Sequence, residues 1–345
     1  MFDRVSAVVD SIVVGGVATA VVAEAGHASG PIWTRAAGRL SAASDAARVT
    51  AATVFDLASL TKVLSTAALA RDLAADGRLD LDARVATLLP PWRGTERADV
   101  TVADLLEHAS GLPAHRSYFE ALAGRTAYLD AIASEPLVYR PRSRSIYSDL
   151  GFMLLGFILE DVGGSPLQMQ FDRWRDTAIG EDAALRFLPP ASWLARTAAT
   201  EQDPWRGRVL VGEVHDENTA ALGGVAGQAG LFGTAEAVGR TARWWLSRLA
   251  SADPWTLRFA RRSTVPGSSR ALAWDTMLPT SSCGSRLSAA AIGHTGFTGT
   301  SIWLDPELDL YAVLLTNRVH PSRANDRLQP VRRAFHDALA EDLAV

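Results

Sequence analysis

Ser59 and Lys62 lie three residues apart at the start of a predicted helix, in the segment FDLASLTKVLSTAALA (residues 55–70). Positions i and i+3 occupy neighbouring sides of one helix face, so the hydroxyl and the amine can come within hydrogen-bonding distance. The pair would be a nucleophile beside a base if burial or a second cation lowered the pKa of the lysine. The free N–H groups of a helix N-terminus would also favour the negative charge that develops during acyl transfer.

A purely structural role explains the same two residues differently. Ser59 would cap the helix, and Lys62 would lie in solvent in its first turn. A capping box, however, requires Glu or Gln at position 62, and a lysine has the wrong sign for the positive end of the helix dipole. Because S-x-x-K also occurs often by chance, the motif alone does not predict an enzyme.

Two further motifs place polar groups where a loop meets a buried element. In RSIYSDLGFMLLG (residues 144–156), Tyr147 and Ser148 open an apolar helical run. In GHTGFTGT (residues 293–300), His294 and Thr295 precede the predicted strand SIWLD, and small residues allow that strand edge to approach a substrate closely. The order S-x-x-K, Y-S-D, H-T-G is much rarer by chance than any one of these motifs.

At these residues the sequence resembles the serine β-lactamase and penicillin-binding protein superfamily, specifically its class C-like branch of β-lactamases, D,D-peptidases and esterases. Three more segments are similar to segments of that family: DLLEHASGLP (residues 104–113), GLFGTA (residues 230–235) and LLTNRVHP (residues 314–321). The resemblance covers nearly the whole chain. It implies a β-lactamase/transpeptidase-like fold.

The resemblance also implies a role for each motif residue. Ser59 would attack a carbonyl to form an acyl-enzyme, and Lys62 would hold the proton network. Tyr147 would be the general base, its phenol pKa lowered by Lys62. The oxyanion hole would consist of the backbone N–H groups of Ser59 and Phe297. Water would then hydrolyse the ester, and neither a metal nor an organic cofactor would be needed.

The sequence departs from the family pattern at two positions in the expected substrate site, which also includes Thr295 and Gly296. Asp149 stands where many family members have Asn. It removes an amide donor and adds a negative charge, which disfavours an anionic substrate if the side chain faces the cleft; alternatively, Asp149 caps the following helix. His294 replaces a commoner lysine and, with a reference pKa of about 6.5, is a weaker carboxylate clamp.

These departures favour neutral esters or amides. We therefore rank a carboxylesterase first, a D,D-carboxypeptidase or D-amino-acid amidase second, and a weak β-lactamase third. Three nearby arginines could compensate by contacting a substrate carboxylate, although a solvated loop is the favoured interpretation: Arg140, Arg142 and Arg144. A hypothesis of another class is a non-catalytic penicillin-binding-like ligand-binding protein, which would not need the full proton network.

Hydrophobic periodicity predicts strands near both ends of the chain and helices between them. Strands are expected at residues 17–24, 31–38, 300–304 and 310–316, with a hairpin turn at 26–30. Helices are expected at residues 2–11, 57–75, 102–108, 118–134, 150–162, 235–249 and 328–343. This layout predicts an α/β (α+β) fold, in which an antiparallel sheet is flanked by terminal helices and carries an inserted, mainly helical domain. We assign residues 1–58 and 285–345 to the sheet domain and 59–284 to the helical domain, with the active site between them.

The composition favours a globular protein that acts on a small molecule. Of 345 residues, 48% are hydrophobic and 21% are charged, and the mean hydropathy is +0.07. The 34 basic and 38 acidic residues give a formal net charge of -4, so no overall field would attract nucleic acid or an anionic membrane. The single cysteine, Cys283, excludes an intramolecular disulfide and is expected to be a buried or idle thiol.

The sequence also bears on location and on metal binding. No segment has the ~20 apolar residues of a membrane span. Residues 11–25 contain a weak export signal, but Asp3 and Asp10 spoil its positively charged start, so a cytoplasmic location is expected. The histidines lack the close spacing that is typical of metal sites.

Overall fold

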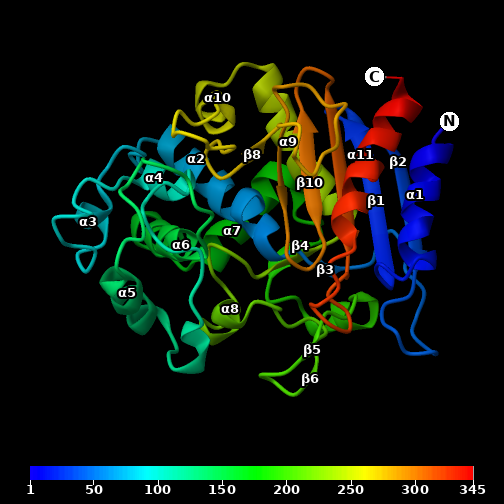
Figure 1. Ribbon diagram of the computed structural model, residues 1–345, viewed down its shortest axis with the longest axis horizontal. Helices are drawn as coiled ribbons and strands as arrows, with labels where there is room; N and C mark the ends of the chain where they lie inside the picture. The colour runs from blue at the N-terminus through cyan, green and yellow to red at the C-terminus, as the bar shows by residue number, and fades with distance from the viewer. Residues whose placement is uncertain (345) are drawn as a thin grey trace.

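A computed structural model describes residues 1–344, which are organised around a six-stranded antiparallel sheet (Figure 1). The strand order is β2-β1-β11-β10-β9-β8, so strands from the two ends of the chain pair in the middle of the sheet. The strands are β1 (Ala20–His27), β2 (Gly30–Gly38), β8 (Asp275–Thr276), β9 (Ile292–Thr295), β10 (Ser301–Asp305) and β11 (Leu310–Thr316). The predicted N-terminal hairpin and the two predicted C-terminal strands are confirmed.

Helices cover both faces of this sheet. Successive side chains of a strand point to opposite faces, and β1 uses this alternation: Val21 packs under α1 (Asp3–Val14) and α11 (Leu328–Leu343), whereas Val22 belongs to the larger core on the other face. On that face α9 (Ala235–Ala250) packs against β1 and β11. Both termini lie at this end of the molecule (Figure 1). The prediction of a sheet flanked by terminal helices is therefore confirmed.

The chain between β2 and β8 is mainly helical, as predicted. Its α-helices are α2 (Ala67–Ala75), α3 (Val85–Leu88), α4 (Val102–Leu106), α5 (Arg125–Ser134), α6 (Asp149–Gly163), α7 (Leu167–Arg175), α8 (Glu217–Ala221), α9 and α10 (Pro254–Ala260). A small second sheet has the order β3-β7-β4, with β3 (Phe55–Asp56), β4 (Leu185–Phe187) and β7 (Leu231–Gly233), and a two-stranded ribbon pairs β5 (Gln202–Asp203) with β6 (Arg208–Val209). These strands of two or three residues are too short for a period of two to reveal them.

Two predicted helices differ from the structure. The helix expected at 118–134 is a single 3₁₀ turn at Tyr118–Glu120 followed by α5, because Gly124 between them adopts a positive φ of 76°. The helix expected at 57–75 consists of a 3₁₀ turn, a π-helical segment and α2. Apolar spacing alone does not distinguish these helix types.

The division of the chain at residues 58 and 284 stays a prediction, and Val345 of the sheet domain lies outside the described residues. Elements of residues 59–284 belong to the sheet or contact it: β8 is its edge strand beside β9, α9 covers one face, and the 3₁₀ turn at Ala58–Leu60 contacts β9. Helix α9 therefore links the helical part of the chain to the sheet.

Among residues 1–344, no single helix is long and apolar enough to cross a membrane. One pair of helical stretches, Asp149–Gly163 and Leu167–Gly180, reaches that length and apolarity only when taken together, and it is bent by 76°.

The close packing of α9 on the sheet predicts the effect of a methyl group at Gly239. A Cβ there would lie 2.1 Å from Glu24 Oε1, the buried carboxylate oxygen that accepts a hydrogen bond of 2.8 Å from Tyr311. Alanine favours a helix by about 1 kcal/mol over glycine, but displacing this carboxylate should outweigh that gain. We expect Gly239→Ala to lower the free energy of unfolding by about 1–3 kcal/mol in urea denaturation.

The matched control is Gly151→Ala in α6, where the nearest atom to a new Cβ would be 3.7 Å away. This variant should be neutral or more stable by up to about 1 kcal/mol. Equal stabilisation of both variants would contradict the packing argument.

Candidate active site

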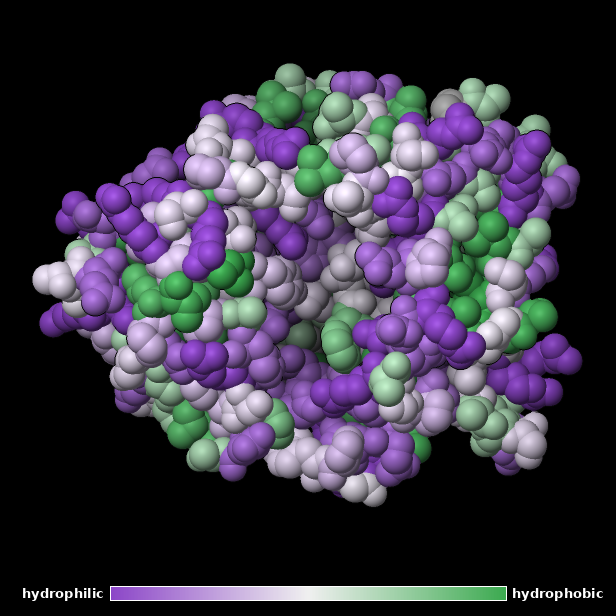
Figure 2. All heavy atoms as spheres, viewed as in Figure 1, coloured by the Kyte–Doolittle hydropathy of each residue, from purple (hydrophilic) through white to green (hydrophobic). Residues whose placement is uncertain are grey.

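The predicted site residues gather in one cavity of about 650 Å³ between the helical part and the sheet. Figure 2 shows the molecule hollowed near the centre of this face. Lys62 lies buried behind Ser59. All the residues predicted to contact substrate line this cavity: Ser59, Tyr147, Asp149, His294, Thr295, Gly296 and Phe297. The structure therefore brings together residues that are up to 238 positions apart in the sequence, from 59 to 297.

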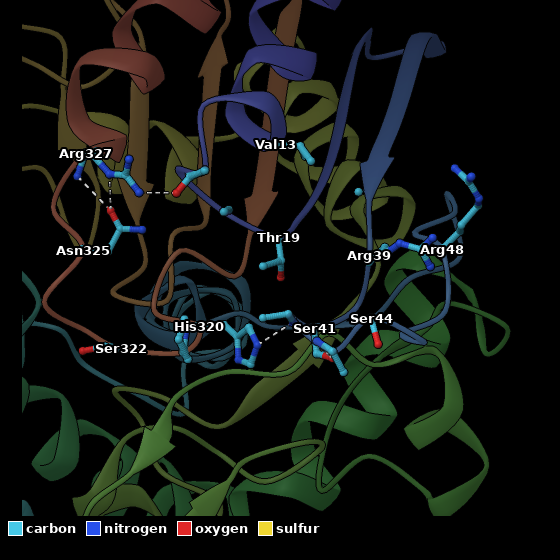
Figure 3. A pocket seen from close by; sticks show the side chains of 16 residues that line it. Val13, Thr19, Arg39, Ser41, Ser44, Arg48, His320, Ser322, Asn325 and Arg327 are labelled. Carbon is cyan, nitrogen blue, oxygen red and sulfur yellow. Dashed lines mark hydrogen bonds between the residues drawn. The ribbon is translucent and has the colours of Figure 1, made fainter.

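A second hollow, of about 750 Å³, lies between the start of β1, the end of β2 and the segment around His320 (Figure 3). Polar side chains that line this hollow form hydrogen bonds with other residues of the chain. The His320 ring is 2.9 Å from the backbone N–H of Ala42 and 2.6 Å from the carbonyl oxygen of Thr200, and Arg327 donates to Asn325. Within residues 1–344, no serine of this hollow is hydrogen-bonded to His320, so the smaller cavity is the candidate active site.

Ser59 is presented by an irregular helix start rather than by an ordinary N-terminus. It lies in the 3₁₀ turn Ala58–Leu60, which the π-helical segment Lys62–Thr66 follows. Ala58 has a φ of +47°, a conformation that costs a non-glycine residue of order 1–3 kcal/mol. Asp56 supports this backbone, because its Oδ1 accepts a 2.8 Å hydrogen bond from the N–H of Ala58.

Lys62 is completely buried and uses all three of its N–H groups. Its Nζ donates to Ser59 Oγ at 3.2 Å, to Asp149 Oδ1 at 2.7 Å and to the Gln228 carbonyl oxygen at 3.0 Å. Burial acts to lower the pKa of Lys62, but Asp149 and Tyr147 raise it, and the pKa lies above its usual value. A depressed lysine pKa, the condition for Lys62 to accept the serine proton, is therefore not met.

Tyr147 is the second group at the nucleophile. Its hydroxyl donates to Ser59 Oγ at 2.8 Å, and its ring packs against His108 with 4.7 Å between ring centroids. Burial raises the pKa of Tyr147, Lys62 lowers it and Asp149 raises it again, so that the pKa lies above its usual value. The expectation of a lowered phenol pKa is wrong, because burial and the carboxylate outweigh the ammonium.

Asp149 faces the cleft and is not the helix cap. Ser148 caps α6, since its hydroxyl accepts a hydrogen bond from the N–H of Gly151 at 3.3 Å. Besides Lys62, the Asp149 carboxylate lies 3.8 Å from Nδ1 of His115. Burial would raise the pKa of Asp149, but Lys62 and His115 lower it to about 2. Asp149 is therefore an ionised partner of Lys62, a role that neither sequence-based interpretation included.

The H-T-G segment forms the opposite wall of the cavity. His294 is buried, and its Nδ1 lies 2.8 Å from the Thr295 carbonyl oxygen. Burial, together with Arg270 and Lys62, holds the pKa of His294 well below its usual value, so the ring is neutral at pH 7. Gly296 approaches Leu57 so closely that a Cβ would lie 2.7 Å from the Leu57 carbonyl oxygen. The close approach of this strand edge to a substrate stays a prediction.

Two threonines connect the two segments that carry the N–H groups of the predicted oxyanion hole. Thr298 Oγ1 donates to the carbonyl oxygen of Asp56 at 2.7 Å, and Thr300 Oγ1 donates to that of Leu57 at 3.1 Å. These bonds join the turn that carries the Phe297 N–H to the backbone just before Ser59. The Phe297 carbonyl oxygen accepts a 2.6 Å hydrogen bond from Arg318. The assignment of the two N–H groups as the oxyanion hole remains a prediction.

Most of the positively charged side chains that line the cavity were not predicted from the sequence. The arginines in the cavity are Arg270, Arg318, Arg323 and Arg332. Of the loop arginines considered from the sequence, Arg142 pairs with Asp104 at 2.7 Å. No local motif marks the cavity arginines as a group, because they come from separate segments. Arg318 lies within one of the segments that carry the sequence resemblance, LLTNRVHP (residues 314–321).

Among residues 1–344, no group of three or more His, Cys, Asp or Glu side chains could hold a metal ion. Cys283 is buried, as expected, and burial raises the pKa of its thiol to about 12.

Known proteins are similar to this chain in sequence and in fold. The beta-lactamase family model matches residues 5–335. A Salmonella gallinarum (strain 287/91 / NCTC 13346) relative named "Putative D-alanyl-D-alanine carboxypeptidase" is 31% identical over 323 residues, covering 82% of this chain and 73% of the relative. A class C beta lactamase from Rhodobacter sphaeroides matches with a TM-score of 0.77 and 21% identity over 99% of each chain. EstCE1, described as a hydrolase with promiscuous acyltransferase activity, matches with a TM-score of 0.74 and 20% identity over 96% of this chain and 97% of its own. These structures have the fold that the sequence resemblance implied.

The threonine bonds predict a variant that misplaces the oxyanion site without touching the nucleophile. Thr298→Val keeps the volume of the side chain but loses the hydrogen bond to Asp56. We expect kcat on an ester substrate to fall about 10- to 100-fold, whereas the free energy of unfolding should fall by only about 1 kcal/mol. Thr298→Ser retains the hydroxyl and should keep most of the activity. A valine variant as active as the wild type would refute this prediction.

Proposed function

Because this chain belongs to the beta-lactamase family, we propose that it is a serine hydrolase that cleaves small esters or amides through an acyl-enzyme on Ser59. The observation that carries the proposal is the pair of hydrogen bonds to one oxygen atom: Tyr147 and Lys62 both donate to Ser59 Oγ, at 2.8 Å and 3.2 Å. A nucleophile held between a phenol and an ammonium has the constellation that acyl transfer requires.

The geometry suggests how the proton moves. When Tyr147 is ionised, its phenolate oxygen takes the proton of Ser59 while Ser59 Oγ forms a bond to the substrate carbonyl carbon. Tyr147 then gives this proton to the leaving group as the scissile bond breaks, and water repeats the sequence to release the acid. Lys62 keeps its proton throughout and supplies positive charge, since its three N–H groups are all engaged.

Within this class a carboxylesterase acting on neutral substrates is our first proposal. The neutral His294 ring supports it, because an uncharged imidazole in the place of a lysine provides no charged clamp for a carboxylate. The same proton network argues against a non-catalytic binding protein, which would gain nothing from burying an ammonium next to a serine hydroxyl.

A second candidate, a D,D-carboxypeptidase, is favoured by two cavity arginines. Arg318 and Arg332 donate to backbone carbonyl oxygens, including that of Thr300 at 3.1 Å from Arg332. Within residues 1–344, the buried Nε of Arg332 has no hydrogen-bond partner. Burial and the charge of Arg318 lower the pKa of Arg332 to about 10. Two neighbouring cations at the cavity suit a substrate carboxylate, as in the activity named for the Salmonella relative.

A substrate panel tests the proposed class. Purified protein should hydrolyse at least one of a series of p-nitrophenyl esters, nitrocefin and a D-Ala-D-Ala peptide, and intact-mass spectrometry should detect an acyl adduct on Ser59. Ser59→Ala should lose turnover by about 10³-fold or more. If no substrate turns over and no adduct forms on the wild type, the proposed function is wrong.

Arg332→Met separates the two candidates. If a substrate carboxylate binds this guanidinium, the substitution should lower kcat/KM for the D-Ala-D-Ala peptide about 10- to 100-fold, which is the effect of losing one charge-assisted hydrogen bond. The kcat/KM for a neutral acetate ester should change by less than about 3-fold. Equal losses on both substrates would show that Arg332 acts only through the fold.

A further inference from the structure

The ion pair between Asp149 and Lys62 lies at the centre of the proton network. Asp149 Oδ1 is 2.7 Å from Lys62 Nζ, the shortest of the three contacts that this nitrogen makes. Lys62 Nζ in turn lies 4.9 Å from the centre of the Tyr147 ring. The ammonium that would stabilise a Tyr147 phenolate is therefore shared with a carboxylate.

This sharing has an electrostatic consequence. A positive charge near a phenol favours its ionised form, whereas a negative charge disfavours it. Lys62 and Asp149 act on Tyr147 in opposite directions, and both act in a buried site where water screens charges only weakly. An uncharged residue of the same shape at position 149 would leave the ammonium free to favour the phenolate.

We propose that Asp149 is a positioning residue that sets the working pH range of the enzyme: by pairing with Lys62 it limits how far the ammonium helps Tyr147 to lose its proton. The inference rests on the proposed function, since it concerns the base of that reaction. It differs from a substrate-binding role for Asp149, because the carboxylate acts through Lys62 and not through the ligand.

Other charged and titratable groups also face this network from the elements around it. Lys62 comes from the π-helical segment. The remaining groups come from the turn after α4, the loop between α4 and α5, the start of α8, the segment before β8, and strands β8 and β9: His108, His115, Asp216, Glu217, Arg270, Asp275 and His294. His108 and His294 are buried with their pKa values well below the usual range, so they stay neutral over the working range. His115 is different, because the Asp149 carboxylate, 3.8 Å from its Nδ1, raises its pKa.

The sign of the effect follows from these charges. Tyr147 must lose a proton to act as the base, so the acid limb of the kcat/KM profile reports its ionisation. Asp149→Asn removes the neighbouring negative charge and should move this limb to lower pH. Lys62 loses its counter-ion in the same variant and gives up its proton more readily, so the basic limb should also move to lower pH. A charged group within about 4–6 Å of a titratable group shifts the pKa of that group by about 1 unit or more.

The experiment compares kcat/KM for one ester substrate from about pH 6 to about pH 12, because the pKa values of Tyr147 and Lys62 both lie above their usual values. Relative to wild type, both limbs of Asp149→Asn should move to lower pH by about 1 unit or more. Asp149→Glu keeps the charge and should leave the limbs close to their wild-type positions. Glu217→Gln removes a carboxylate of the same cavity that pairs with Arg323 rather than with Lys62, and its limbs should not move.

Three outcomes would overturn the inference. Activity of Asp149→Asn could fall equally at every pH with its limbs unmoved, which would mean that Asp149 only holds the structure. Both limbs could move to higher pH. The acid limb could vanish in His115→Gln, which would assign it to the imidazole. All three require an active wild type that acylates Ser59, so they are distinguishable from a failure of the proposed function, in which the wild type itself has no turnover.

Discussion

The buried ammonium of Lys62 is the constraint around which this site is built. Removing a charged group from water costs several kcal/mol unless partners replace its hydration. Here three acceptors do so: Ser59 from the preceding 3₁₀ turn, Asp149 from the start of α6, and the Gln228 carbonyl from the loop before β7. Each acceptor belongs to a different part of the helical region. Satisfying one charge therefore fixes three segments against one another and places the cavity wall between them.

The sheet contributes the other wall through an equally specific contact. Thr298 and Thr300 follow β9 and donate to the backbone of residues 56 and 57, just before the nucleophile. The turn between β9 and β10 is thus bonded to the segment that presents Ser59. Strand β3 pairs with β7 at the same place. The geometry at Ser59 depends on both walls, and neither the sheet nor the helices alone could maintain it.

The sequence was sufficient for the motif residues and for the architecture, because both have local signatures. The three motifs specify residue types at short spacing, and apolar alternation revealed β1, β2, β10 and β11. What the sequence could not supply were relations between distant positions. The ion pair of Asp149 with Lys62 joins residues 87 positions apart, and nothing near Asp149 distinguishes a helix cap from a counter-ion. The direction of the Tyr147 pKa was wrong for the same reason, since it depends on how strongly burial and this carboxylate oppose the lysine.

The charges in the cavity suggest how a substrate would be oriented. Lys62 and Asp149 compensate each other, His294 is neutral, and Arg323 pairs with Glu201 and Glu217, each at 2.6 Å. The guanidinium groups of Arg318 and Arg332 instead donate to carbonyl oxygens, so their positive charge remains available. The field is therefore close to balanced at the nucleophile and positive farther along the wall that carries Phe297. A substrate with one anionic end would place that end at the arginines and its scissile carbonyl at Ser59, whereas a neutral ester would gain its orientation from the oxyanion site alone. The charge of a substrate should thus affect its binding through Arg318 and Arg332. It should not affect the proton transfer at Ser59, which depends on Tyr147, Lys62 and Asp149.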